Sequence, residues 1–177
     1  WIECRILSSG ARTNPWMQES SNKIIQAGEI VSFDTDMVGP YGYCADISRT
    51  YVEGNKFDDN QKKLYLMAVE QINHNSRLIK PGMSFKEFTE KSWILPEEYY
   101  GNRYSVMVHG IGLCDEWPAI RYPTDGGERS GVFERNMTIT VESYIGKVGG
   151  NEGVKLEQQY LVGQNSLELM SNHPLED

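Results

Sequence analysis

The chain has only three cysteines, Cys4, Cys44 and Cys114, and no Cys-x-x-Cys pair. This pattern argues against a disulfide framework or a zinc knuckle and indicates reduced thiols in a cytoplasmic protein. No apolar run approaches the ~20 residues that a membrane span needs. Basic residues are scarce, with 17 Lys and Arg against 25 Asp and Glu and a net charge of −8. Nucleic acid is therefore not expected as a partner, because a phosphate backbone needs clustered cations.

An initiator methionine and a signal peptide are also missing, because the chain begins at Trp1 and enters an apolar stretch at once. We therefore expect a piece of a longer protein. Its 177 residues suffice for one domain with its own core. No linker, repeat or low-complexity tract divides them, so we expect a single domain over residues 1–177.

Turn residues separate segments of different periodicity. Alternating or β-rich stretches predict strands at 1–7, 29–37, 43–52, 137–144 and 154–162, with an apolar, glycine-broken run at 106–112 and loops at 8–15, 93–103 and 124–131. Helical spacing predicts an amphipathic helix over 59–79. Ser84 is expected to cap a short helix, with Glu87 as its capping-box partner.

Carboxylates gather in the first predicted hairpin. Asp34 and Asp36 are two residues apart and share a strand face, and Asp46 lies on the returning strand. Three carboxylates on one face repel one another unless a cation lies between them, and a divalent metal is an economical solution. Taken singly, each aspartate is as compatible with an exposed strand position or a turn.

The second predicted hairpin repeats this theme. Glu142 and Glu157 lie in its two strands, and His109 lies in the apolar run before it. One histidine with several carboxylates is a plausible ligand set for Mn, Fe, Co or Zn. A lone histidine is more often a core residue and a lone glutamate more often faces solvent, so the order of the motifs decides between these interpretations.

Five motifs stand in order: Asp34-Thr35-Asp36, 42–50, His109-Gly110-Ile111-Gly112, Thr140-Val141-Glu142 and 153–157. This order resembles the creatinase/methionine-aminopeptidase superfamily over most of residues 29–163. The resemblance implies an α+β pita-bread fold, a curved antiparallel sheet with flanking helices. The chain would lack the first part of that domain and any N-terminal creatinase-like domain. It also implies a dinuclear metal centre with Asp36, Asp46, His109, Glu142 and Glu157 as ligands, in which Asp46 and Glu157 bridge the ions.

Two departures from the superfamily stand out. Asp46 follows Asp36 by ten residues and Asp34 by twelve, on either side of the usual spacing, so we keep both as ligands and prefer Asp36. The peptidases also carry a second histidine shortly after the ligand histidine. This chain has Asp115 and Glu116 there instead, which suggests chemistry other than amide hydrolysis.

Segments 33–50 and 106–118 resemble the dimethylsulfoniopropionate (DMSP) lyases of the DddP type. This resemblance implies β-elimination of DMSP to dimethyl sulfide and acrylate, with Asp115 as general base. Tyr104 and Trp117 are candidates to bind the sulfonium on their aromatic faces, with a packing role as the alternative for each.

The same resemblance implies two divalent metal ions, iron first and manganese, cobalt or zinc as alternatives. A small sulfonium carboxylate is the expected substrate, and a homodimer is expected for the full-length protein. Two other classes remain open. One is a metal-dependent aminopeptidase, Xaa-Pro peptidase or creatinase-like hydrolase with Asp115 or Glu116 in place of the histidine. The other is a metal-free binding module of the same fold.

Overall fold

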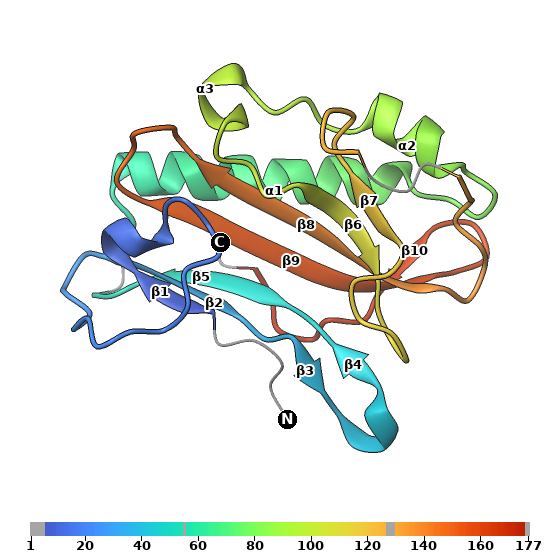
Figure 1. The fold of residues 1–177 in the computed structure, drawn as a ribbon, viewed down its shortest axis with the longest axis horizontal. Helices are drawn as coiled ribbons and strands as arrows, with labels where there is room; N and C mark the ends of the chain where they lie inside the picture. The colour runs from blue at the N-terminus through green and yellow to red at the C-terminus, as the bar shows by residue number, and fades with distance from the viewer. Residues whose placement is uncertain (1–5, 55, 127–129, 176–177) are drawn as a thin grey trace.

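The computed structural model describes residues 6–54, 56–126 and 130–175 (Figure 1). The predictions for residues 1–5 and 127–129 lie outside this part of the chain. The strands are antiparallel and form a three-stranded sheet, β1-β2-β5, a five-stranded sheet, β10-β9-β8-β6-β7, and a short β3-β4 ladder.

The strand bounds are β1 Leu7–Ser9, β2 Ile30–Asp34, β3 Met37–Val38, β4 Cys44–Ala45, β5 Ser48–Val52, β6 Val106–Gly110, β7 Ala119–Arg121, β8 Thr138–Gly146, β9 Gly153–Val162 and β10 Leu167–Leu169. The helices are α1 Asp59–Leu78, α2 Phe85–Lys91 and α3 Glu97–Tyr100, and 3-10 turns cover Gly10–Thr13 and Pro40–Gly42.

The two larger sheets join along β5 and β9, which run beside each other in Figure 1. Side chains of β5 make the connection. The hydroxyl of Thr50 donates to the carbonyl of Lys155 at 2.7 Å, and the guanidinium of Arg49 donates to the carbonyl of Glu157 at 2.6 Å. These bonds satisfy backbone groups of β9 from a neighbouring strand, so the sheets act as one curved layer.

Helix α1 covers one face of the five-stranded sheet and builds the main core (Figure 1). Leu64, Ala68 and Ile72 recur at helical spacing and are buried. Burial of a Leu or Ile side chain contributes about 1.5–3 kcal/mol. The helix begins with a capping box, in which Asp58 accepts from the amide of Gln61 at 2.8 Å and Gln61 accepts from that of Asp58 at 2.9 Å. None of the helices in the described ranges combines the length and the apolar character needed to cross a membrane.

The hairpin predicted over 29–52 is confirmed as the β2-β5 pair, with an interruption that the alternation did not predict. The hydroxyl of Thr35 accepts from the amide of Ile47 at 3.0 Å and lies 3.2 Å from the Ile47 carbonyl, where a ladder bond would otherwise form. Asp36 has a φ of 22° at this break. Local side-chain bonds therefore displaced the regular ladder and separated β3 and β4 from the longer strands.

Other outcomes are mixed. The helix over 59–79 and the strands near 137–144 and 154–162 are confirmed. Ser84 does cap α2, accepting from the amide of Glu87 at 3.0 Å, but the carboxylate of Glu87 accepts from Lys91 at 2.6 Å. The loop over 93–103 was wrong, because Pro96 starts the short helix α3. The loop over 8–15 was wrong as well, because β1 extends to Ser9 by pairing with β2. Strands β7 and β10 were not predicted.

Candidate metal centre

His109, Glu142 and Glu157 point to the same side of the five-stranded sheet. Glu142 and Glu157 are direct partners across β8 and β9, and His109 on β6 pairs with Thr140, two residues before Glu142. The Nε2 atom of His109 lies 3.3 Å from Glu142 Oε1 and 3.2 Å from Glu157 Oε1. The Nδ1 atom lies 3.0 Å from the carbonyl of Gly110, which fits an Nδ1–H donor and leaves a lone pair on Nε2.

The three aspartates complete the cluster from the first hairpin. One oxygen from each of Asp34, Asp36 and Asp46 lies within 4.8 Å of the others, and Asp46 forms a second such group with His109 and Glu157. The backbone N–H of Asp36 donates to Asp46 Oδ1 at 3.2 Å, while Asp46 Oδ2 lies 3.8 Å from His109 Nε2. Asp46 is thus common to both groups. Whether Asp34 or Asp36 is the principal ligand stays open.

Lys155 is a member of this site that the sequence reasoning did not single out. Its side chain is 1% exposed, and its Nζ atom lies 2.8 Å from Glu142 Oε2 and 3.1 Å from Glu157 Oε2. The same atom donates to the hydroxyl of Ser48 at 2.8 Å and lies 3.7 Å from Asp34 Oδ2. The cluster therefore contains one fixed positive charge of its own.

Burial makes several ionised carboxylates in one place costly. Burial, followed by the charge of Glu157, raises the pKa of Asp46 to about 12 and that of Glu142 to about 8. The pKa of Glu157 falls to about 2, because Lys155 and then His109 outweigh the effect of burial. Burial alone would lower the pKa of His109, but the carboxylates of Glu142 and Glu157 raise it to about 10. Without a further cation, the site therefore retains protons at neutral pH.

The donor set fits a divalent metal ion. Three of its atoms, His109 Nε2, Glu142 Oε1 and Glu157 Oε1, are fully buried and lack an aligned hydrogen-bond partner among the described residues. Buried polar atoms are almost always satisfied, so such a group calls for an explanation. Imidazole nitrogen and carboxylate oxygens together are a usual ligand set for first-row metals, which bind the deprotonated forms.

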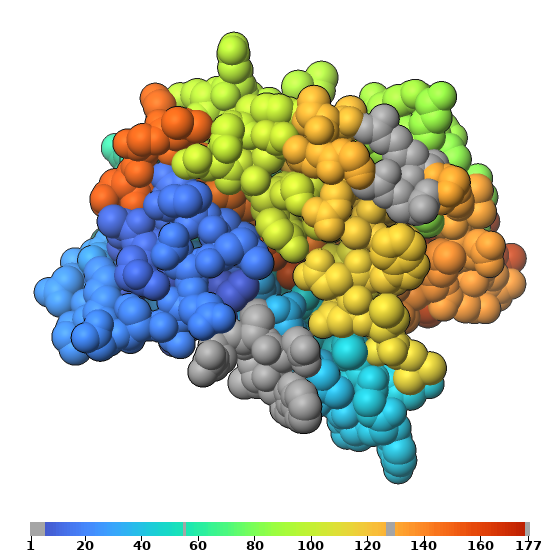
Figure 2. Space-filling model, viewed as in Figure 1, coloured from blue at the N-terminus to red at the C-terminus, as the bar shows by residue number. Residues whose placement is uncertain are grey.

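Asp115 lies beside the cluster on the loop that follows β6. It is not a member of either ligand group, and its Oδ1 accepts from the amide of Glu116 at 3.0 Å. Burial, followed by the charge of Asp36, raises the pKa of Asp115 above its ordinary value, against an opposing effect of His109. The amide of Cys44 on β4 donates to the carbonyl of Gly112 at 2.6 Å and fixes this loop; in Figure 2 the loop, in yellow, lies against the β3-β4 segment, in cyan.

The two predicted substrate-binding aromatic residues lie in different surroundings. The ring of Tyr104 is centred 5.4 Å from Lys155 Nζ, and its hydroxyl donates to Glu116 at 3.4 Å, so Tyr104 is at the site. Trp117 is 61% exposed and lines a surface hollow of about 340 Å³ with Gly110 and other residues that are not ligands. Its role stays a prediction. Trp16, which the sequence reasoning missed, is buried with its ring centred 5.5 Å from Lys155 Nζ.

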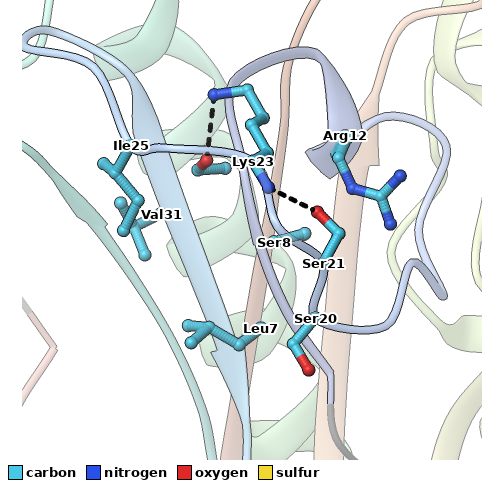
Figure 3. Close-up of a pocket in the computed structure, with 9 residues that line it drawn as sticks. Leu7, Ser8, Arg12, Ser20, Ser21, Lys23, Ile25 and Val31 are labelled. Atoms are coloured by element: carbon cyan, nitrogen blue, oxygen red, sulfur yellow. Dashed lines mark hydrogen bonds between the residues drawn. The ribbon is translucent and has the colours of Figure 1, made fainter.

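A smaller hollow of about 60 Å³ lies between β1, β2 and the segment 20–25 (Figure 3). Lys23 crosses it, with its backbone N–H donating to the hydroxyl of Ser21 and its ammonium to that of Ser9, both at 3.2 Å. The ammonium is also paired with Glu29 at 2.5 Å. None of the predicted site residues lines this hollow, so it is separate from the metal centre.

A buried histidine and carboxylates on a curved antiparallel sheet define a metal-dependent hydrolase or lyase of the pita-bread class. The chain belongs to metallopeptidase family M24, whose model matches residues 2–164. It is 42% identical to dimethylsulfoniopropionate lyase DddP of Roseovarius nubinhibens over 99% of its length, and 39% identical to the lyase of that name of Roseobacter denitrificans over the same share. It spans about 40% of the length of these curated relatives.

Solved structures support the same fold. The prolidase of Pyrococcus furiosus matches 96% of this chain and 49% of its own, with a TM-score of 0.80 and 28% sequence identity. The pita-bread fold expected from the sequence is therefore confirmed. A group of side chains that could hold a metal ion is also present, as the family suggests, whereas the number and identity of the ions are matters for the proposal below.

Proposed function

We propose that the protein is a metal-dependent lyase that cleaves DMSP to dimethyl sulfide and acrylate. The similarity to two DMSP lyases over nearly the whole chain supports this proposal. The observation that carries it is the loop after His109, which brings Asp115 rather than a second histidine to the cluster. The other two histidines are engaged elsewhere: His74 lies 3.1 Å from the carbonyl of Lys91, and His173 contacts the hydroxyl of Tyr51 at 2.8 Å.

The proposed ligands are Asp36, Asp46, His109, Glu142 and Glu157, with Asp34 as an additional or alternative ligand. We propose two divalent ions, iron first and manganese, cobalt or zinc as alternatives, with Asp46 and Glu157 shared between them. When bound, the ions would supply positive charge that binds the substrate carboxylate and makes the adjacent C–H more acidic.

Asp115 is the proposed general base. It accepts the proton from the carbon next to the carboxylate, and the electrons of that C–H bond form the double bond of acrylate. The C–S bond breaks at the same time, and its electron pair leaves on sulfur as neutral dimethyl sulfide. Partial burial and the neighbouring charge of Asp36 raise the pKa of Asp115, which makes it a stronger base than an exposed aspartate.

Tyr104 is the proposed aromatic contact of the sulfonium group. A cation is attracted to an aromatic face by about 0.5–2 kcal/mol, depending on how far it is desolvated. The Lys155 ammonium already lies 5.4 Å from the ring centre, which shows that this ring accommodates a nearby cation. Trp117 remains a second candidate. A homodimer and a cytoplasmic location remain predictions as well.

A metallopeptidase is the second candidate, because the family and the prolidase structure both point to peptide hydrolysis. One comparison separates the two. The purified full chain, loaded with iron or manganese, is incubated with DMSP and, in parallel, with an Xaa-Pro dipeptide. Dimethyl sulfide in the headspace and no free proline is the expected result. Release of proline without dimethyl sulfide would replace the lyase by a peptidase.

A further inference from the structure

Lys155 is a buried cation whose hydrogen-bonding capacity is fully used. An ammonium group has three N–H donors. In Lys155 they are matched by three oxygens, Glu142 Oε2 at 2.8 Å, Glu157 Oε2 at 3.1 Å and Ser48 Oγ at 2.8 Å. No donor is left for a substrate. Whatever Lys155 does at this site, it therefore does through the residues that it holds.

The oxygens that Lys155 holds are not the ones that face the histidine. It takes the Oε2 atoms of Glu142 and Glu157, while the Oε1 atoms of the two glutamates lie 3.3 and 3.2 Å from His109 Nε2. Those Oε1 atoms and Nε2 are the buried atoms that lack a hydrogen-bond partner. Each glutamate thus has one oxygen tied to the lysine and the other directed at the place where a metal ion fits.

The surroundings of Lys155 keep its ammonium in place. The rings of Trp16 and Tyr104 are centred 5.5 and 5.4 Å from Nζ. Ser48, which accepts from Lys155, also donates a short hydrogen bond to Asp34. The side chain is 1% exposed, so water does not compete for its bonds.

We propose that Lys155 is a positioning residue of the metal centre: by binding one oxygen of Glu142 and one of Glu157, it turns their other oxygens toward His109 as a ready-made metal-binding face. The inference rests on the metal centre of the proposed function but not on the identity of the substrate. Lys155 differs in this from the ligands, because it contacts neither substrate nor metal.

A simple counter-ion role makes the opposite prediction about metal affinity. The five carboxylates Asp34, Asp36, Asp46, Glu142 and Glu157 carry five negative charges, and two divalent ions with one lysine would balance them. If Lys155 supplied only charge, its removal would leave the site more negative and tighten the binding of cations. If it positions the glutamates, its removal weakens binding, as loss of an outer hydrogen-bond partner commonly does by about 10- to 100-fold.

The test is a Co²⁺ titration of the metal-free full chain, followed by calorimetry and by the visible absorption of bound Co²⁺. Lys155→Met is compared with wild type and with Lys155→Arg. Lys147→Met is the matched control, because it removes an exposed lysine that pairs with Glu98 at 3.0 Å. We expect about 10- to 100-fold weaker binding and an altered Co²⁺ spectrum in Lys155→Met, partial rescue in Lys155→Arg, and wild-type behaviour in Lys147→Met.

Unchanged or tighter Co²⁺ binding by Lys155→Met would overturn the proposal, and so would a wild-type protein that binds no Co²⁺. Circular dichroism checks that each variant is folded. If Lys155→Met is not, Lys155→Gln is titrated instead, since its amide can still donate to one glutamate; wild-type affinity in that variant would overturn the proposal equally. No DMSP is present in these measurements, so failure of the lyase activity and failure of the positioning role are seen separately.

Discussion

Replacement of Asp115 by asparagine removes the proposed base while keeping the local structure. The side chain is not in either ligand group, and its one hydrogen bond, accepted from the amide of Glu116 at 3.0 Å, can be accepted by the Asn oxygen as well. Metal binding and folding should therefore be retained. Loss of a general base usually costs about 10²- to 10⁴-fold in rate, which corresponds to about 3–5 kcal/mol in the activation free energy.

The assay is dimethyl sulfide release from DMSP, measured by gas chromatography over a range of pH, with metal content determined on the same preparations. In the wild type, kcat/KM should rise with pH through a pKa above the ordinary value of Asp, because Asp115 must be ionised to act and its pKa is raised. The matched control is Glu116→Gln, which neutralises the adjacent carboxylate. Turnover within about threefold of wild type in Asp115→Asn, or an equal loss in Glu116→Gln, would refute the assignment.

Three further outcomes follow from the structure. Glu157→Gln should reduce metal content, measured by mass spectrometry, because the residue is in a ligand group, and it should destabilise the protein by about 3–5 kcal/mol by leaving Lys155 without its ion pair. Gly110→Ala should cost about 1–3 kcal/mol in urea unfolding, because an added Cβ would overlap the carbonyl of Trp117; a variant as stable as wild type would contradict this packing. Metal-free protein should lose thermal stability as the pH rises from about 5 to 8, since Glu142 has a folded-state pKa raised from 4.5 to about 8, and its contribution is complete below 4.5 and lost as the pH passes 8. Saturating Mn²⁺ should remove this loss by binding the ionised carboxylates, and a flat profile in chelator would contradict it.

The residues of the metal centre could be predicted from the sequence because their chemistry is expressed in type and order. A carboxylate pair two residues apart, a His-Gly-Ile-Gly run and two strand glutamates are informative without coordinates. The structure brings all six together, with His109, Glu142 and Glu157 in mutual contact and Asp34, Asp36 and Asp46 beside them. Periodicity also predicted α1 well, because its apolar positions face a single core.

What the sequence did not predict depends on partners distant in the chain. Strand β1 continues to Ser9 because β2 lies beside it, and β7 forms because β6 offers an edge. The break at Thr35 and Asp36 depends on a hydroxyl that bonds Ile47 across the hairpin. Local propensity contains none of this information, since each case is decided by a non-local hydrogen-bond partner.

Lys155 is a different kind of omission, because the sequence did contain the signal. It stands two residues before Glu157 on the same strand, and alternate residues of a strand share a face. Once Glu157 is assigned to the buried side of β9, Lys155 must point to that side too. A lysine is almost never fully buried unless it is paired, so its partners had to be carboxylates already assigned to the site. The same alternation, applied outward from each proposed ligand, would have found the one cation that the acidic cluster contains.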